Sequence, residues 1–242
     1  MEKIVIKGGR KLKGTINISG SKNAALPIMA ASLLSSQGKT KLMNVPMVND
    51  VLTLKKALDE LGAQVHFSER CALIDANSVN NYMMPFDESK KMRASVLLAG
   101  PLLAKFGQVM VTEPGGCIIG NRPIDLHLAG FEALGAKVER VNKYYLKIEA
   151  DRLKGNRINF QFSSVGATEN LIMAACLAAG KTLIENAARE PEIVDLANFL
   201  MCMGAKIKGA GSSTIKIEGV KELVATEYTI MPDRIETGTY MV

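Results

Sequence analysis

Hydrophobic and polar positions alternate with a helical period in three stretches, each of which ends in Gly-Ala. The stretches are residues 51–65 (VLTLKKALDELGAQV), 124–138 (IDLHLAGFEALGAKV) and 193–207 (IVDLANFLMCMGAKI). Apolar residues three and four positions apart form one face of a helix, and glycine commonly follows the last helical residue. We therefore predict three amphipathic surface helices that end at Gly62, Gly135 and Gly204, each running into a strand. Polar residues near two of the starts, namely Asn49 or Asp50 and Asn121 or Asp125, are the expected N-caps.

A second set of stretches is apolar nearly all round and precedes the first set. These are residues 23–34, 92–103 and 167–179, and such helices are typically buried on every side. Between the helices lie stretches typical of strands, at residues 40–45, 64–68, 71–75, 108–112, 137–141, 144–149, 157–162, 182–185 and 214–218. A unit of strand, buried helix, strand, surface helix and strands, about 70 residues long, thus occurs three times. The prediction is an α/β (α+β) domain of three pseudo-symmetric repeats, in which sheets surround buried helices.

Composition narrows the class of protein. The 242 residues are 48% apolar and 22% charged, which is typical of a globular chain with its own core. The four cysteines show no CxxC pair, the N-terminus resembles no signal peptide, and no apolar run is long enough to span a bilayer. We therefore expect a cytoplasmic protein without a zinc site or disulfide framework. The net charge of +6, without a basic block or any Trp, favours a small anionic ligand over nucleic acid.

Polar and cationic clusters begin the predicted buried helices. Residues 19–23 (SGSKN) begin the first, Lys90, Lys91 and Arg93 the second, and residues 163–168 (SSVGAT) the third. Free backbone N–H groups at a positive helix end form a ready anion site. For any one of these clusters, ordinary N-capping by serine is the favoured explanation. Three equivalent starts together with Arg122 favour a cleft that binds an anion. Threefold symmetry would bring all three helix starts to one side of the domain.

Cys117 lies in a segment that contains Pro114, Gly115, Gly116 and Gly120, so a loop is expected there. Arg122 follows five residues later, and a cationic neighbour lowers the pKa of a thiol and raises its reactivity. The alternative is a thiol without a function in a surface turn. Cys71, Cys176 and Cys202 are expected to be structural, the last two in the core, and His66 is expected to be structural as well. His127, on a surface helix, remains a minor candidate for substrate contact.

Together these motifs resemble those of the UDP-N-acetylglucosamine enolpyruvyl transferase (UDP-N-acetylglucosamine 1-carboxyvinyltransferase) family. The matching stretches are residues 19–27 (SGSKNAALP), 92–95 (MRAS), 114–117 (PGGC), 120–127 (GNRPIDLH), 164–170 (SVGATEN), 185–192 (ENAAREPE) and 232–238 (PDRIETG). They extend over the whole chain. The sister family, 5-enolpyruvylshikimate-3-phosphate synthase, shares the fold and lacks the cysteine loop.

The resemblance implies an inside-out α/β fold and a cytoplasmic transferase that acts in peptidoglycan synthesis, and so in cell wall biogenesis, cell shape and division. The implied reaction moves enolpyruvate from phosphoenolpyruvate to the 3-hydroxyl of UDP-N-acetylglucosamine, releases phosphate and needs no cofactor or metal. Cys117 would be the proton donor and the residue that fosfomycin alkylates. Lys22 and Arg122 would act with it, and the substrate-binding residues would be Lys22, Asn23, Arg93, Arg122, Pro123, Ile124, Asp125, Leu126, Ser164, Val165 and Gly166.

Two departures from the family pattern bear on this reading. Phe162 occupies a place where some members carry a lysine, so one diphosphate contact is in doubt. The family's second half is also absent. Residues 1–19 are then expected to be strands of that second domain, residues 20–229 the first domain, and residues 230–242 the start of the second.

The alternative function is a catalytically inactive sugar-nucleotide-binding or regulatory module, and a third interpretation is a different anion enzyme on a related fold. The second half could be another chain.

Overall fold

The interior of the protein is formed by three helical segments. The computed structural model describes residues 3–9, 11–112 and 124–242. Helix α1 (Lys22–Ala31) continues as the 3-10 turn η1 (Ser32–Leu34), η2 (Arg93–Leu98) continues as α4 (Ala99–Phe106), and α6 (Val165–Ala175) is the third segment. Every residue of α1 from Ala24 to Ala31 is buried, as is every residue of α6 from Ala167 to Ala175. The prediction of three helices that are buried all round is confirmed.

Three amphipathic helices lie outside this interior set. They are α2 (Asn49–Glu60), α5 (Asp125–Ala133) and α7 (Pro191–Cys202). Each is followed by the predicted glycine, and Gly62, Gly135 and Gly204 have φ angles of 98°, 92° and 108°. A left-handed residue of this kind ends a helix with little strain only if it lacks a Cβ atom. The helix ends were therefore predicted correctly.

The predicted N-caps of α2 and α5 are wrong. Val48 and Ile124 occupy the cap positions, so Asn49 and Asp125 are the first helical residues and Asp50 is the second. The carboxylates of Asp50 and Asp125 still interact favourably with the positive end of the helix dipole, although neither caps a backbone N–H group. Asn121, the other candidate cap, lies outside the described residues.

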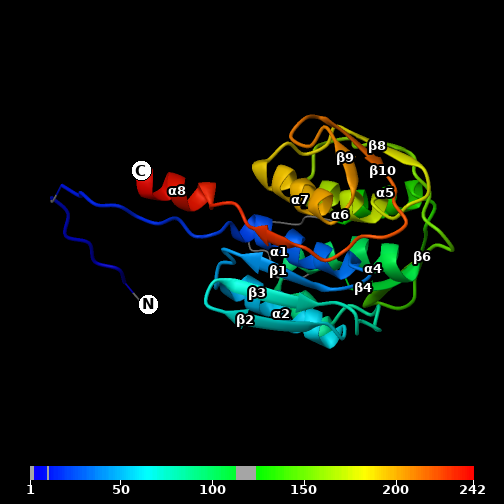
Figure 1. The fold of residues 1–242 in the computed structure, drawn as a ribbon, viewed down its shortest axis with the longest axis horizontal. Helices are drawn as coiled ribbons and strands as arrows, with labels where there is room; N and C mark the ends of the chain where they lie inside the picture. The colour runs from blue at the N-terminus through cyan, green and yellow to red at the C-terminus, as the bar shows by residue number, and fades with distance from the viewer. Residues whose placement is uncertain (1–2, 10, 113–123) are drawn as a thin grey trace.

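Three sheets, each built on three antiparallel strands in the same order, surround the interior helices (Figure 1). The first holds β1 (Lys39–Met43), β3 (Cys71–Asp75) and β2 (Gln64–Ser68) in that order. The second holds β4 (Gln108–Thr112), β6 (Tyr145–Glu149) and β5 (Lys137–Arg140), and the third holds β8 (Lys181–Glu185), β10 (Thr214–Glu218) and β9 (Lys206–Lys208). In each sheet the last strand of the unit lies between the other two. This shared topology confirms the threefold pseudo-symmetry.

Each sheet also receives one parallel neighbour, and the first unit obtains it from the far end of the chain. β7 (Arg157–Asn159) pairs with β8, and Met83 forms an isolated parallel bridge to Met110 of β4. In the first sheet the parallel partner of β1 is β11 (Glu227–Thr229). The predicted unit placed a strand before every buried helix. That order is wrong for the first unit, because its strand comes after the third unit.

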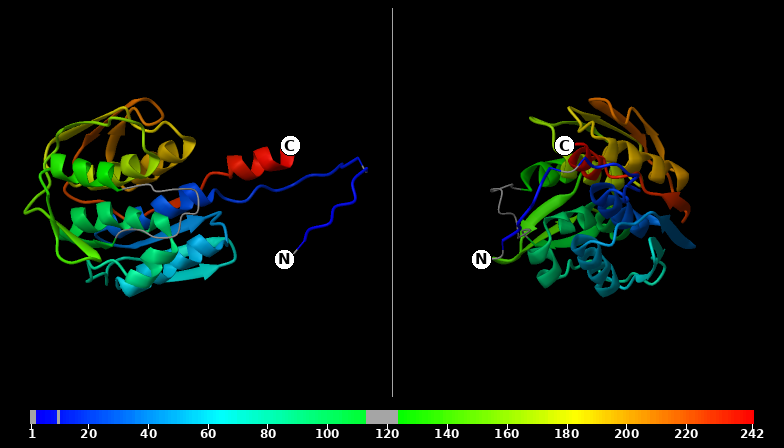
Figure 2. Two further views of the ribbon diagram at one scale, coloured as in Figure 1. Left: turned by 180° about the vertical axis from the view of Figure 1, so that it is seen from behind. Right: turned by 90° about the vertical axis from the view of Figure 1, so that its left-hand side faces the viewer.

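Two helices and one extended segment complete the described chain. α3 (Phe86–Lys91) was not predicted, and it places Lys90 and Lys91 at its own C-terminal end rather than at the start of a buried helix. α8 (Arg234–Met241) is capped by Asp233, whose Oδ1 accepts from the backbone N–H of Ile235 at 2.8 Å. Residues 3–9 and 11–19 form no helix or strand, and they lie beyond the main body together with α8 (Figures 1 and 2). Their assignment to a second domain remains a prediction.

The cysteines separate into core and surface positions. Cys176 is buried, as predicted, and its burial raises the pKa of the thiol to about 12. Cys202 is exposed, so the prediction that it lies in the core is wrong. The buried face of α7 carries Ile193, Leu196, Ala197 and Leu200, and Cys202 falls on the opposite side of the last turn. Cys71 begins β3 and is half-buried.

Candidate functional site

A cavity of about 600 Å³ lies where the starts of the three interior helical segments meet. Its lining comes from α1, η2 and α6, with additional residues from α2, α5, α7 and α8. The residues are Lys22, Asn23, Leu26, Asp50, Met92, Ala94, Val96, Leu97, His127, Ser164, Val165, Gly166, Glu169, Glu190, Glu192 and Arg234. The helix starts that the sequence placed on one side of the domain therefore do converge. We call this space the helix-start cavity.

The start of α1 brings a lysine and an uncapped helix end to the cavity. The Lys22 ammonium forms an ion pair with Asp50 of α2, with 2.8 Å between Nζ and Oδ2. Ser21 stands at the N-cap position, but its hydroxyl makes no capping bond and has no hydrogen-bond partner in the described part of the chain. The N-capping interpretation is therefore wrong at this helix. The N–H groups of a first helical turn are unpaired within the helix and can bind an anion.

The start of α6 supports the simpler interpretation. Ser164 is its N-cap and accepts a hydrogen bond from the Ala167 N–H at 3.4 Å. Val165 and Gly166 follow and line the cavity. A Cβ atom on Gly166 would lie 3.3 Å from Cε1 of His127, so glycine lets the imidazole pack against the helix start. Capping and ligand binding are compatible here, because one serine satisfies only part of the free N–H groups.

His127 belongs to this cavity, contrary to its expected place on an outer helix surface. Only 5% of its surface is exposed, and its Nδ1 lies 2.8 Å from Nδ2 of Asn170. The orientation of the Asn170 amide is fixed, because its Oδ1 accepts from the Gly100 N–H at 2.7 Å and its Nδ2 donates to the Val96 carbonyl at 2.9 Å. Nδ1 of His127 must therefore accept, which leaves the proton of a neutral imidazole on Nε2.

Carboxylates that the sequence did not single out also line the cavity. Glu169 is 4% exposed, and burial, followed by the nearby charges of Glu192 and Glu190, raises its pKa well above the usual 4.5. Glu192 is 3% exposed and pairs with Arg234, with 3.0 Å between Oε1 and Nε. When Glu169 is neutral, Glu190 is the one charged carboxylate of the described lining that forms no ion pair with a described lysine or arginine.

The described lining is therefore less cationic than an anion site requires. Lys22 and Arg234 are its lysine and arginine side chains, and a carboxylate pairs with each. The side chain of Arg93 and the whole of Arg122, the other two predicted cations, lie outside the described residues. Cys117 and Pro123 lie outside them as well.

A second cavity, of about 340 Å³, holds other predicted residues. Asp125 and Leu126 of α5 line it together with β7 and the residues after it, up to Gln161. Ile124, at the start of the same helix, is buried. Asp125 and Leu126 thus line a different cavity from Lys22, Asn23 and residues 164–166. Phe162 lies in the chain between Gln161, which lines the second cavity, and Ser164, which lines the first, and 61% of its surface is exposed.

The described part of the chain contains no cluster of three His, Cys, Asp or Glu residues suited to a metal ion. Among the described helices, none has both the length and the apolar character that crossing a membrane requires. For the binding of a ligand, the helix-start cavity provides helix N-termini, an imidazole with a defined tautomer, two ion pairs and a buried carboxyl group.

Solved structures define the class of fold. The chain matches the enolpyruvyl transferase NikO of Streptomyces tendae with a TM-score of 0.84 and 22% identity, over 97% of this chain and 55% of that one. It matches an EPSP synthase of Acinetobacter baumannii with a TM-score of 0.77 and 19% identity, over 97% of this chain and 53% of that one. The fold is therefore that of the enolpyruvyl transferases.

Sequence comparison defines the family. The chain belongs to the EPSP synthase (3-phosphoshikimate 1-carboxyvinyltransferase) family, whose sequence model matches residues 6–242. It is 54% identical over 242 residues to a UDP-N-acetylglucosamine 1-carboxyvinyltransferase 2 of Carboxydothermus hydrogenoformans, and 52% identical over 243 residues to a UDP-N-acetylglucosamine 1-carboxyvinyltransferase of Cellvibrio japonicus. The chain spans 57% and 58% of the length of these relatives. Both names agree with the family that the sequence motifs predicted.

Proposed function

We propose that this chain is part of an enzyme that transfers enolpyruvate from phosphoenolpyruvate to the 3-hydroxyl of UDP-N-acetylglucosamine and releases phosphate. The reaction would be the first committed step of peptidoglycan synthesis, in the cytoplasm of a bacterium. The observation that carries the proposal is the convergence of Lys22, Asn23 and residues 164–166 on one cavity. The relatives at 52% and 54% identity support the choice of substrates, because both are named for this activity.

Each part of the two substrates would be bound by its own set of residues. Backbone N–H groups at the start of α6 suit the diphosphate, with Ser164, Val165 and Gly166 as its contacts. Asn23 would hold the sugar, and Asp125 and Leu126, with Arg122, Pro123 and Ile124, would hold the uridine. Lys22, Arg93 and Arg122 would bind the phosphate and carboxylate of phosphoenolpyruvate, since charge-assisted hydrogen bonds to such groups are strong.

The proposed reaction proceeds by addition and elimination. The 3-hydroxyl oxygen bonds to C2 of phosphoenolpyruvate while a proton is added to C3, which gives a tetrahedral ketal. Loss of a proton from C3 and departure of phosphate from C2 then restore the double bond. Cys117 would be the donor of the first proton. By resemblance to the family, an aspartate of the enzyme's second half would take the proton from the sugar hydroxyl.

A second candidate is a sugar-nucleotide-binding module without turnover. The chain spans less than three fifths of the relatives' length, so a test on this chain has to distinguish binding from turnover. Phosphate release from the two substrates separates the candidates, because a binding module retains nucleotide affinity and releases none.

Nucleotide affinity tests the cavity directly. We expect UDP-N-acetylglucosamine to bind the chain in a calorimetric titration, and Lys22→Gln to weaken the binding of phosphoenolpyruvate about tenfold, because a charged hydrogen bond contributes about 1.5–3 kcal/mol. Lys56→Gln is the matched control, since Lys56 is an exposed lysine on α2. Equal losses in both variants would place the ligand elsewhere, and no binding by a folded chain would remove the proposal that this part alone holds the nucleotide.

Thiol chemistry tests the role of Cys117. Fosfomycin should alkylate Cys117, and peptide mass spectrometry should find this label lost in Cys117→Ala while nucleotide affinity changes less than about tenfold. Cys202 is the internal control for simple exposure, because it is exposed on α7, and Cys176 is the buried control. Equal labelling of Cys117 and Cys202 would show that exposure alone governs the reaction and would contradict a special role for the loop.

A further inference from the structure

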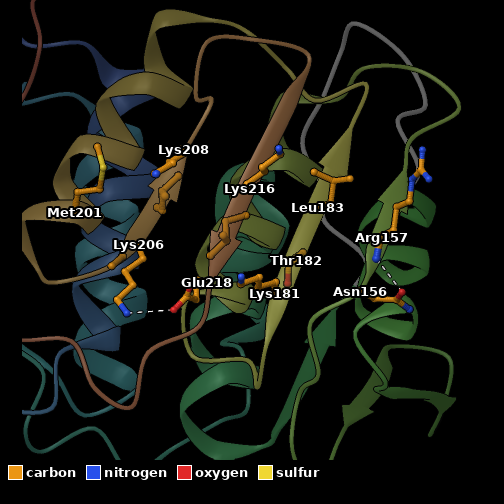
Figure 3. Close-up of a pocket in the computed structure, with 13 residues that line it drawn as sticks. Asn156, Arg157, Lys181, Thr182, Leu183, Met201, Lys206, Lys208, Lys216 and Glu218 are labelled. Atoms are coloured by element: carbon orange, nitrogen blue, oxygen red, sulfur yellow. Dashed lines mark hydrogen bonds and ion pairs between the residues drawn. The ribbon is translucent and has the colours of Figure 1, made fainter.

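The outward face of the β7-β8-β10-β9 sheet is hollowed and basic (Figure 3). A groove of about 790 Å³ runs over it, and its charged lining includes Arg157, Lys181, Lys206, Lys208, Lys216 and Glu218. We call this surface the basic groove. It lies on the opposite face of the sheet from the buried side chains Ile184 and Ile215, and so apart from the helix-start cavity.

The strand register arranges these cations in rows across the sheet. Lys216 of β10 stands opposite Lys208 of β9 on one side and Leu183 of β8 on the other, and Leu183 stands opposite Arg157 of β7. Neighbouring strands are about 4.8 Å apart, so this row extends over about 14 Å. Like charges directly opposite each other destabilise a sheet. The Lys208–Lys216 pair is therefore a local cost that a bound anion would relieve.

The sheet does not supply enough carboxylates to balance these charges. Its described outward positions hold five basic residues and two acidic ones, Glu185 and Glu218. Glu185 pairs with Arg157 at 2.6 Å, and Glu218 pairs with Lys206 at 3.2 Å. Lys181, Lys208 and Lys216 form no ion pair in the described part of the chain. The pKa of Glu218 is lowered, chiefly by Lys206 and also by Lys181 and Lys208, as expected in a field of excess positive charge.

The shape and apolar content of the groove define the kind of ligand. Its cations come from four strands and are exposed, so they do not converge on one point as a site for a single phosphate would. Leu183 and the 41%-exposed Met201 provide an apolar floor, which the lysine alkyl chains extend. No aromatic residue is among the described residues that line the groove, and proteins that bind single-stranded nucleic acid use such residues as stacking platforms.

We propose that the basic groove binds an acidic peptide segment of a partner protein, with its carboxylates at Lys208 and Lys216 and its apolar side chains over Leu183 and Met201. An extended peptide places every second side chain on one face, about 6.8 Å apart, which suits cations spread over several strands. The proposal does not depend on the proposed enzymatic function.

The test is fluorescence anisotropy with a labelled nine-residue peptide of repeated Glu-Glu-Leu. The 242-residue chain should bind it, and the double variant Lys208→Gln/Lys216→Gln should bind about tenfold more weakly, because each exposed ion pair contributes modestly. The control Lys56→Gln/Lys137→Gln removes the same charge from exposed lysines on α2 and β5. Its affinity should stay within about twofold of the original, and the Gln-Gln-Leu peptide should not bind.

Two outcomes would overturn the proposal. The first is an equal loss in both double variants, which would mean that net charge alone attracts the peptide. The second is tighter binding of a single-stranded oligonucleotide that Lys208→Gln/Lys216→Gln abolishes, which would make the groove a nucleic-acid site. UDP-N-acetylglucosamine affinity should be the same in the chain and in Lys208→Gln/Lys216→Gln, so failure here and failure of the proposed function are distinguishable.

Discussion

Replacing Asn170 by alanine should lower the free energy of unfolding by about 3–5 kcal/mol. The side chain of Asn170 is fully buried and joins three elements, because it bonds the backbone of Gly100 and of Val96 and also contacts His127. Alanine would leave the buried N–H of Gly100 without its partner, which costs about 1–3 kcal/mol. It would also remove one of the two hydrogen bonds that the Val96 carbonyl accepts, the other coming from the Ala99 N–H, and the contact with His127, and each lost hydrogen bond costs about 0.5–1.5 kcal/mol. The helices cannot close the gap, because a Cβ on Gly100 would already lie 2.5 Å from the Asn170 carbonyl oxygen.

Urea unfolding monitored by circular dichroism measures this effect. Asn49→Ala is the matched control, since Asn49 is exposed in the first turn of α2 and caps nothing, and it should change the free energy by less than about 0.5 kcal/mol. Asn170→Asp should cost at least as much as alanine, because a carboxylate cannot donate to the Val96 carbonyl. A loss below about 1 kcal/mol in Asn170→Ala would show that water replaces the amide and that the network does not fix α4 against α6.

Local patterns were sufficient to predict the C-terminal ends of the three amphipathic helices but not their starts. Helix ends at Gly62, Gly135 and Gly204 could be predicted, because a left-handed residue after a helix favours glycine whatever surrounds it. The N-caps of α2 and α5 could not, because the cap depends on the angle at which the chain enters the helix, and Val48 and Ile124 take those positions. Lys90 and Lys91 were misplaced because the short helix α3 has no periodic signal of its own.

The candidate site required the tertiary structure, although one signal was present in the sequence. His127, Gly130, Phe131 and Leu134 follow a helical period, and this pattern could have placed His127 on the buried face of α5. Glu169, Glu190 and Glu192 gave no such signal, since only the packing of α7 beside α6 brings them together. The pairing of β11 with β1 could not be predicted either, because the two strands come from opposite ends of the chain.

Replacing Glu169 by glutamine should remove a pH-dependent part of the protein's stability. Burial raises the pKa of Glu169 in the folded state, and the charges of Glu192 and Glu190 raise it further. The folded chain therefore binds a proton more tightly than the unfolded chain does. The resulting stabilisation is complete below the usual carboxyl pKa of 4.5 and is lost as the pH rises through the raised value.

The expected difference can be stated per pH unit. Within that window the free energy of unfolding of the original chain should fall, relative to Glu169→Gln, by up to about 1.4 kcal/mol per pH unit. Glutamine matches the neutral acid in shape and cannot ionise, so its profile lacks this slope. Urea unfolding between pH 5 and pH 8 measures both profiles. Glu185→Gln is the control, because Glu185 is paired with Arg157 and its pKa is lowered, so it should not remove the slope.

Parallel profiles would mean that Glu169 ionises at its usual pH inside the helix-start cavity. The cavity would then hold two carboxylates, Glu169 and Glu190, outside the ion pairs that Lys22 and Arg234 form. Such a lining would repel phosphoenolpyruvate and a nucleotide diphosphate unless further cations compensated. A steep profile that Glu169→Gln flattens would instead show that the cavity keeps one acid neutral, which would favour the proposed binding of anionic substrates at these helix starts.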